Sequence, residues 1–364
     1  NASSIHQYGQ KARAAVEKAR EAVAVMLGCR AAELVFTCGG TESDNFAVFG
    51  VVKPGDHVVT STIEHSAVLN ACKILEERGA SVTYVAADSK SLVRAEEVRA
   101  ALRPNTKLVS IMMANNETGV IQPVEEIARV IAESNAKREE KIIFHIDAVQ
   151  AAGKIEIDVK KIGCDLLSIS GHKMHAPQGT GALYIKTGTR VQPLLYGGTH
   201  ERQRRAGTEN LPGIVGLGKA AEIVVRGFTD GSVAKLGAMR DRLQAAILSS
   251  IEDCGINGGG APRVPNTTNV YINHLEGEAL IIALDLKGIA VSAGAACSSG
   301  AIEPSHVLVA MGMPKAQARA SIRISLGKHN TDEDVDYMIS VLPETAAKLR
   351  ELSPSYNRKE AVTT

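Results

Sequence analysis

Short apolar runs alternate with amphipathic segments over the first two hundred residues, and this alternation constrains the fold more than any other feature of the chain. Strands are expected at 34–37, 57–60, 81–85, 108–113, 142–146, 165–169 and 183–185. Helices are expected at 10–27, from 41 onward, at 66–78 and at 123–133. The strand runs lack a clean alternation of polar and apolar residues, which indicates strands covered on both faces. The pattern predicts an α/β fold with a mostly parallel, seven-stranded sheet.

The chain changes character near residue 229. After an expected helix at 211–226, only two further strands are expected, at 269–272 and 321–325, among helices at 233–250, 276–287 and 331–352. Residues 1–228 therefore predict a large domain, and residues 229–364 predict a smaller α+β domain. A length of 364 residues suits two domains.

Composition excludes several classes of protein. Lys and Arg total 41 against 40 Asp and Glu, without a long basic run, so no nucleic-acid partner is expected. No apolar stretch is long enough to cross a bilayer, and residues 1–4 lack the basic and apolar regions of a signal peptide. The six cysteines are scattered and form no C-x-x-C pair, so neither a disulfide framework nor a metal site is expected, and a reducing cytosol fits best.

Lys173 follows directly on an apolar run. The run 164–170 ends in small residues and leads into Gly171, His172 and Lys173. A lysine held at a strand end, away from bulk water, can act as an amine nucleophile toward an aldehyde, which is the role of a pyridoxal phosphate lysine. A surface lysine in a turn is the alternative, and for one lysine taken alone it is the commoner outcome.

The segment 37–45 predicts an anion site. A strand ends there, Gly39 and Gly40 turn the chain, and Thr41 begins a helix, so backbone N–H groups and the helix dipole would face a ligand. The lysine pattern of a P-loop is missing, which argues against an ATP-type site. An ordinary strand-to-helix turn capped by Thr41 is the alternative.

Other polar residues also follow apolar strands. Asp147 would be a costly buried carboxylate unless paired, and a protonated pyridine nitrogen is one suitable partner; capping of the next helix is the alternative. Gln150 lies one turn further on. His65 opens a helix and can stack on a flat ring or move protons, although a structural histidine is commoner. Residues 115–119 form a polar loop that supplies amide donors or simply turns the chain.

All these positions lie at the C-terminal ends of expected strands, where open α/β sheets bind ligands. No G-x-G-x-x-G follows the first strand, so a phosphate-bearing aromatic aldehyde fits better than a dinucleotide. In the C-terminal region, residues 292–300 surround Cys297 with small residues. A thiol in such an accessible loop can be a nucleophile, and a buried cysteine in a tight turn is the alternative.

Together these motifs resemble those of the group I (NifS/IscS-type) cysteine desulfurases, a family with the class-V aminotransferase fold. The resemblance covers essentially the whole chain and rests on residues 38–45, 64–65, 115–119, 145–150, 170–173, 205–210, 292–300 and 321–327. It implies a type I pyridoxal phosphate-dependent transferase fold. The large domain would bind the cofactor, and the small domain would carry the cysteine loop.

The resemblance also implies a role for each site residue. Lys173 would carry pyridoxal 5'-phosphate, Asp147 would pair with the ring nitrogen, His65 would stack over the ring and move protons, and Cys297 would attack the substrate's sulfur. The remaining implied contacts are Gln150 and Asn116 at the ring's 3-oxygen side, Gly40, Thr41, Ser170 and His172 at the phosphate, Thr208 at the phosphate of the neighbouring subunit, and Arg323 with Asn116 at the substrate carboxylate.

The implied activity converts L-cysteine to L-alanine through a pyridoxal phosphate ketimine and a Cys297 persulfide, supplying sulfur for iron–sulfur cluster assembly or other acceptors. The implied state is a cytoplasmic homodimer that meets a sulfur-acceptor or iron–sulfur scaffold protein. A selenocysteine lyase is the alternative within the fold, and a non-catalytic sulfur-relay or scaffold subunit is the alternative of another class. Family members usually begin with a segment resembling Tyr-Leu-Asp-Asn-Ala-Ala-Thr-Thr-Pro. This sequence starts after that segment, so part of the small domain and one rim of the substrate site are expected to be affected.

Overall fold

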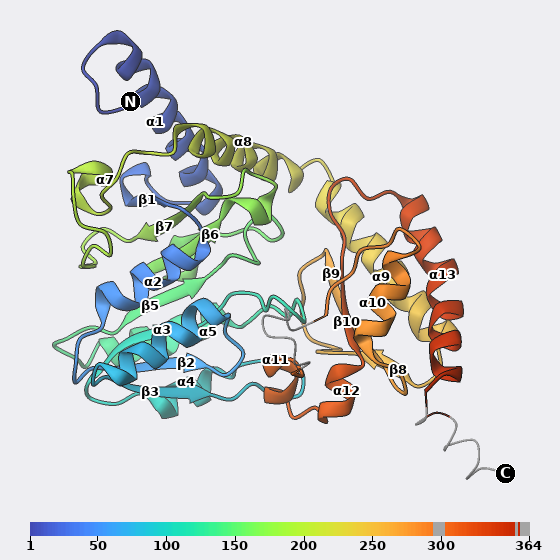
Figure 1. Cartoon of the computed structure of the whole chain (residues 1–364). Coiled ribbons are helices and arrows are strands. Elements are labelled where there is room, and N and C mark those ends of the chain that lie inside the picture. Colours follow the sequence, from blue (N-terminus) through green and yellow to red (C-terminus); the bar gives the residue numbers. More distant parts are fainter. Residues whose placement is uncertain (294–302, 354–355, 357–364) are drawn as a thin grey trace. The chain divides into compact units, whose positions relative to one another are not determined.

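The computed structural model describes residues 1–293, 303–353 and 356, and within them the chain divides into two compact units (Figure 1). Unit 1 comprises residues 1–86, 93–115 and 121–230. Unit 2 comprises residues 87–92 and 116–120 and the described residues from 231 onward. In the part of the chain that the structure describes, no helix combines the length and the apolar character needed to span a membrane.

A seven-stranded sheet in the order β1-β7-β6-β5-β4-β2-β3 forms the centre of unit 1. Its strands are β1 Leu34–Thr37, β2 His57–Ser61, β3 Ser81–Val85, β4 Thr106–Ser110, β5 Ile143–Asp147, β6 Leu166–Ser170 and β7 Gly181–Ile185. Strand β7 runs antiparallel to both of its neighbours, and the other six strands share one direction. The expected mostly parallel sheet is confirmed, and the carboxyl ends of six strands lie along one edge.

Helices pack on this sheet. They are α1 Gln7–Leu27, α2 Gly40–Val51, α3 Ser66–Glu77, α4 Ala95–Ala101, α5 Val124–Asn135, α6 Val159–Ile162, α7 His200–Gln203 and α8 Leu211–Gly227, with short 3-10 turns η1 Ala31–Glu33 and η2 Gly171–Met174. Helices α2 and α3 pack together over the sheet through a buried core that includes Phe46, Val48, Val68 and Leu75. Helices α1 and α8 lie side by side (Figure 1).

Several expected boundaries in unit 1 are shifted by one to three residues, and two of these differences bear on the site. The strand expected at 108–113 is β4, which ends at Ser110. Beyond it, only Ile111 and Met113 donate to β5, so the chain stays beside β5 but leaves the regular ladder. Helix α2 begins at Gly40 and has Gly39 as its N-cap, with a φ of 156° that favours glycine. Thr41 therefore lies inside the first turn and does not cap the helix.

Unit 2 contains a three-stranded antiparallel sheet in the order β10-β9-β8. Its elements are α9 Ser232–Ser250, β8 Cys254–Ile256, β9 Thr267–Ile272, α10 Gly277–Asp285, α11 His306–Ala310, α12 Lys315–Arg319, β10 Ser321–Ser325 and α13 Asp332–Glu351. Helices α9, α10 and α13 share a core with the sheet that includes Leu243, Val270, Leu280 and Leu342. This is the α+β arrangement expected for the C-terminal region.

Candidate active site

The turns that follow β1 and β6 touch each other. A Cβ atom added to Gly40 would lie 2.7 Å from Val149 Cγ2 and 3.5 Å from Ser170 Cβ, and one added to Gly181 would lie 2.8 Å from Gly39 Cα. The N-terminus of α2 therefore meets the end of β6 and the chain just after Asp147. Backbone N–H groups at a helix N-terminus favour an anion such as a phosphate. The structure thus brings together the predicted phosphate residues Gly40 and Ser170.

Lys173 belongs to η2, the turn that follows β6, and is half-buried. Its neighbour His172 is exposed, and its Nδ1 lies 3.0 Å from Ser170 Oγ. Burial and the charge of Lys173 lower the pKa of His172. His172 is therefore a neutral hydrogen-bonding group at neutral pH, beside the N-terminus of α2.

Asp147 is a buried carboxyl at the end of β5, 4 % exposed. One carboxylate oxygen accepts the Val149 N–H at 2.9 Å. Burial raises the pKa of Asp147, and the Val149 bond and the His65 charge act against this rise. The carboxyl caps a turn rather than a helix, because the next helix, α6, begins only at Val159. A cation held against it would offset the cost of its burial.

Two further buried carboxyl groups accompany Asp147, and no sequence pattern indicated a role for either of them. Glu64 accepts the Ser61 hydroxyl at 2.5 Å and the Met112 N–H at 3.0 Å. Burial raises the pKa of Glu64 to about 8, and the charge of Asp147 adds to the rise. Burial and Asp147 likewise raise the pKa of Asp44, in α2, well above its usual range. Burial therefore favours the protonated form of both groups, whereas the Val149 N–H and the His65 charge support the ionised form of Asp147.

His145 supports this cluster as a neutral ring. It lies 2.8 Å from Ser110 Oγ on β4 and 2.9 Å from Ser168 Oγ on β6, so it joins three neighbouring strands. Burial lowers its pKa to about 3. Its Nε2 is 3.7 Å from Asp44 Oδ1. His145 is part of the motif 145–150, but its contacts are those of a structural residue.

His65 is the N-cap of α3, and its ring is exposed. Nδ1 accepts the Ala67 N–H at 3.1 Å, so the neutral ring carries its proton on Nε2. The capping contact orients the ring while leaving it at the surface of unit 1. Gln150 is half-buried, and its Oε1 accepts a hydrogen bond from Lys154 Nζ. Thr208 is exposed between Gly207 and the residues that lead into α8.

In unit 2, Arg323 and Asn116 are in contact. Arg323 Nη1 donates to the Asn116 carbonyl at 2.7 Å. Arg323 Nε and Asn116 Oδ1 are buried and have no hydrogen-bond partner among the described residues. Glu117 accepts the Ser305 hydroxyl, and burial raises its pKa to about 7 against the opposing effects of Ser305 and Arg323. The unpartnered Nε of the guanidinium suits an acceptor such as a carboxylate, and the unpartnered Asn116 oxygen suits a hydrogen-bond donor on the same ligand.

Arg323 also pairs through its backbone with the start of the segment that contains the predicted nucleophile. Ser292 N donates to the Arg323 carbonyl at 3.1 Å, and Arg323 N donates to the Ser292 carbonyl at 2.7 Å. Cys297 itself lies outside the described residues.

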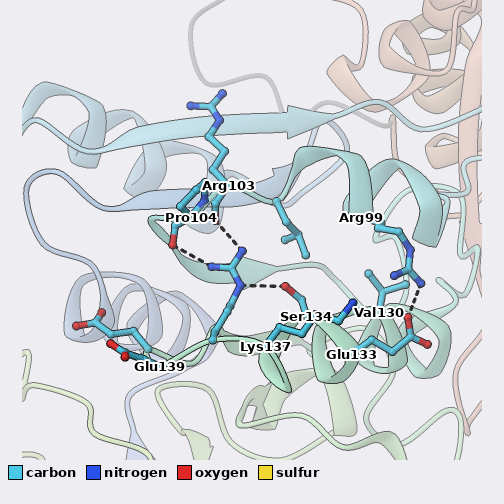
Figure 2. A pocket seen from close by; sticks show the side chains of 11 residues that line it. Arg99, Arg103, Pro104, Val130, Glu133, Ser134, Lys137 and Glu139 are labelled. Atoms are coloured by element: carbon cyan, nitrogen blue, oxygen red, sulfur yellow. Dashed lines mark hydrogen bonds and ion pairs between the residues drawn. The ribbon is translucent and has the colours of Figure 1, made fainter.

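A pocket of about 810 Å³ elsewhere in unit 1 takes no part in this arrangement (Figure 2). It lies between α4, α5 and residues 137–140, ahead of the first residue of β4. Its polar groups bond one another: Arg138 donates to the carbonyls of Pro104 and Arg103 at 3.0 and 2.7 Å, and Arg99 pairs with Glu133 at 2.8 Å. The pocket contains none of the residues predicted from the sequence.

Replacing Glu64 with glutamine should change how stability depends on pH. The folded protein keeps the Glu64 proton up to about pH 8, whereas the unfolded chain releases it near its ordinary pKa of 4.5. The contribution of this carboxyl to stability is therefore complete below pH 4.5 and is lost as the pH rises through 8, by at most about 1.4 kcal/mol per pH unit. Glu64→Gln should thus gain melting temperature relative to the parent between about pH 5 and pH 8. The exposed control Glu77→Gln should differ from the parent in melting temperature by an amount that stays constant over this range. A constant difference for Glu64→Gln would contradict the raised pKa of Glu64.

The comparisons with known proteins agree with this geometry. Residues 1–338 match the family described as "Aminotransferase class-V". A cysteine desulfurase from a Nostoc species is 48% identical over 360 residues, which cover 98% of this chain and 88% of the relative. A solved structure titled "NIFS-LIKE PROTEIN" has a TM-score of 0.88 at 38% identity and covers 96% of this chain and 92% of its own. Another, titled "SspA in complex with cysteine", has a TM-score of 0.77 at 36% identity, with coverages of 91% and 92%. The chain therefore belongs to the class-V aminotransferase family and, within it, to the cysteine desulfurases.

Proposed function

We propose that this protein binds pyridoxal 5'-phosphate, takes the sulfur from L-cysteine, releases L-alanine and holds the sulfur as a persulfide on Cys297. The names of its relatives, one of them solved with cysteine, support the substrate. The observation that carries the proposal is the buried Asp147 carboxyl, at the end of β5 and beside the strand that leads to Lys173.

The residues of unit 1 fit such a cofactor. Asp147 offers a buried anion to a protonated ring nitrogen. Gly40 leaves no room for a side chain at the N-terminus of α2, and the phosphate would be held there by Gly40, Thr41, Ser170 and His172. Bound there, the cofactor would supply an electron sink for cleavage of the carbon–sulfur bond.

The protein's own groups would orient the reactants and move protons. Lys173 would hold the cofactor and transfer protons at its Nζ. His65, oriented by the Ala67 N–H, would stack on the ring and exchange its Nε2 proton. Gln150 and Asn116 would bond the 3-oxygen side of the ring. Arg323, whose Nε has no partner among the described residues, would take the substrate carboxylate together with the side-chain N–H groups of Asn116.

Cys297 would perform the sulfur step. Its thiolate would form a bond to the sulfur of the bound cysteine while the carbon–sulfur bond breaks. The carbon would keep the electron pair and take up a proton, which gives alanine. The persulfide would then pass its outer sulfur to an acceptor, such as a protein that assembles iron–sulfur clusters.

We further propose a cytoplasmic homodimer with shared sites. Thr208 is exposed on unit 1, as a residue that reaches a neighbouring subunit's phosphate must be. Large apolar side chains are exposed on the same unit, among them Ile5, Tyr8 and Tyr196 at 91, 81 and 81 %. We also keep 1–228 as the cofactor-binding domain and 229–364 as the domain that carries the cysteine loop.

Product analysis of the purified protein tests the proposed reaction. Incubated with pyridoxal phosphate, L-cysteine and a thiol reductant, the protein should form alanine and sulfide in equal amounts. Parallel reactions with selenocysteine separate desulfurase from selenocysteine lyase activity. A protein that carries sulfur but forms no alanine would be a relay subunit, and the proposal would then be wrong.

Replacing Asp147 with asparagine tests the observation that carries the proposal. Asparagine keeps the size and can still accept the Val149 N–H, but it removes the negative charge that would keep the ring nitrogen protonated. Turnover should fall by roughly 10²–10³-fold, in the range found when one preorganised electrostatic contact is removed. Steady-state kinetics and the absorbance spectrum measure the effect, and Asp147→Glu should recover part of it. Unchanged turnover in Asp147→Asn would remove the basis of the assignment.

A further inference from the structure

Three consecutive residues of α7, none of them glycine, have left-handed backbone. The φ angles of Glu201, Arg202 and Gln203 are 47°, 56° and 65°. This conformation is unfavourable for residues with a Cβ atom, which adopt it singly rather than in runs. Tertiary contacts must therefore hold the segment in this shape. Two close ion pairs supply them, one at each end of residues 201–205, and Arg202 adds a longer one to Glu17 at 3.7 Å.

The first pair joins Glu201 to Arg20 of α1. Arg20 Nη1 and Nη2 each donate to one oxygen of Glu201 at 2.8 Å, and both side chains are 4 % exposed. The same carboxylate accepts the Phe36 N–H at 2.9 Å, and Arg20 also donates to the Leu34 carbonyl at 3.2 Å. This bidentate, charge-assisted contact attaches the strained segment 201–203 to α1 and to β1.

The second pair joins Arg205 to Glu42 of α2. Arg205 Nε and Nη2 donate to the two oxygens of Glu42 at 2.8 and 3.2 Å. Glu42 also accepts the Cys38 N–H at 2.8 Å. The Arg205 guanidinium and the Cys38 contacts hold the pKa of Glu42 below its usual value in spite of burial. The far end of the segment is therefore attached to the turn that is proposed to hold the phosphate.

Thr208 belongs to the short stretch 206–210, which follows this second ion pair and leads into α8. The other end of the stretch is fixed by Asn210, whose side chain accepts the Gly213 N–H at 3.2 Å and donates to the Gly179 carbonyl at 3.2 Å. Gly207 has a φ of 105°, which glycine adopts readily, and both Gly207 and Thr208 are exposed. The position of Thr208 thus depends on the segment 201–205.

We infer that the Arg20–Glu201 ion pair positions Thr208 for the neighbouring subunit, so that a residue pair buried in one subunit serves the cofactor phosphate of the other. This inference rests on the shared site proposed above. Arg20 and Glu201 are positioning residues, because they act through the segment and not on the cofactor. Loss of the Arg20–Glu201 ion pair in one subunit should therefore weaken cofactor binding in the site of the neighbouring subunit.

Mixed dimers test this inference. Glu201→Gln subunits and Lys173→Ala subunits carry different affinity tags and are combined. The mixed dimer, which carries both tags, is then isolated. In it, the Glu201→Gln subunit keeps its own Lys173 and receives Thr208 from an undamaged partner. The mixed dimer should have about half the parent activity and one tight site in a pyridoxal phosphate titration. Glu201→Gln homodimers should bind the cofactor roughly tenfold more weakly than the parent.

Mixed dimers that bind the cofactor as weakly as Glu201→Gln homodimers would overturn the inference, because Glu201 would then support only the site of its own subunit. Homodimers of Glu201→Gln with native cofactor affinity would overturn it as well. Glu21→Gln is the matched control, since Glu21 is an exposed carboxylate of the same helix α1, and this variant should leave affinity unchanged. If Glu201→Gln does not fold, Arg20→Lys replaces it in the experiment, because lysine keeps the positive charge but cannot form the bidentate contact.

A parallel mixture separates this inference from the function on which it rests. Lys173→Ala subunits mixed with Thr208→Ala subunits should form one site with neither defect and should recover activity. Failure of this mixture would disprove the shared site itself. Its success together with failure of the Glu201→Gln mixture would disprove only the role of the ion pair.

Discussion

Replacing Lys173 with alanine is expected to abolish turnover of cysteine. Lys173 lies in the turn after β6, half-buried, where we propose that it holds the cofactor and moves protons. Loss of a positioned proton-transfer group alone costs roughly 10²–10⁴-fold in rate. Loss of the covalent link adds to this cost. Alanine formation and the visible absorbance of the lysine-linked cofactor should both disappear, although the phosphate residues can still bind the cofactor weakly.

Lys186→Ala is the matched control for this experiment. Lys186 follows β7 and pairs with Asp165 at 3.3 Å, with half of its side chain exposed. It should keep parent activity and absorbance. A Lys173→Ala variant with parent activity would rule out the proposed role of Lys173.

Replacing Cys297 with serine should stop the reaction at a different point. The variant should keep the cofactor absorbance and still bind cysteine, because Asp147, Lys173 and Arg323 are unchanged, but it should release neither alanine nor sulfide at a useful rate. A serine hydroxyl is a far weaker nucleophile toward sulfur than a thiolate. After a short pulse of cysteine, mass spectrometry of the parent should find one added sulfur on the peptide that contains Cys297.

The other cysteines are suitable controls for this experiment. Burial raises the thiol pKa of every cysteine that the structure describes, namely Cys29, Cys38, Cys72, Cys164 and Cys254. Such thiols stay protonated at neutral pH and react slowly. Cys38 is the strictest control, because it is exposed beside the proposed phosphate turn and its pKa is about 11. Added sulfur on Cys38, or normal turnover by Cys297→Ser, would contradict the mechanism.

Local patterns predicted most elements of the fold. The strands 34–37, 81–85 and 321–325 have the expected bounds, because each is an apolar run between turns. Helix α4, Ala95–Ala101, was not expected, because its short sequence is mostly charged and carries only one buried residue, Val98. Strand β8 was also missed, since three residues are too few to show a period.

Contacts between distant residues could not be predicted. Nothing in the neighbourhood of Glu201 indicates a partner 181 residues away at Arg20. The buried carboxyl cluster gives no signal either, because Asp44 and Glu64 resemble ordinary helix and turn residues until the sheet brings β2, β4 and β5 together. The motif resemblance singled out Asp147 and Lys173, but it gave no role to the two buried carboxyls beside Asp147, those of Asp44 and Glu64.

Residues 87–92 and 116–120 belong to unit 2, although they are synthesised together with unit 1. Ser91 Oγ lies 3.1 Å from Thr118 Oγ1, and Val120 forms a bridge with Arg263. About 140 residues separate Val120 from Arg263, so at ribosomal speeds of roughly 5–20 residues per second the earlier stretch leaves the tunnel about 7–30 s before its partner. Residues 87–92 and 116–120 are thus synthesised before the part of unit 2 that contains Arg263, the bridge partner of Val120. The last third of the nascent chain has to capture them as it emerges.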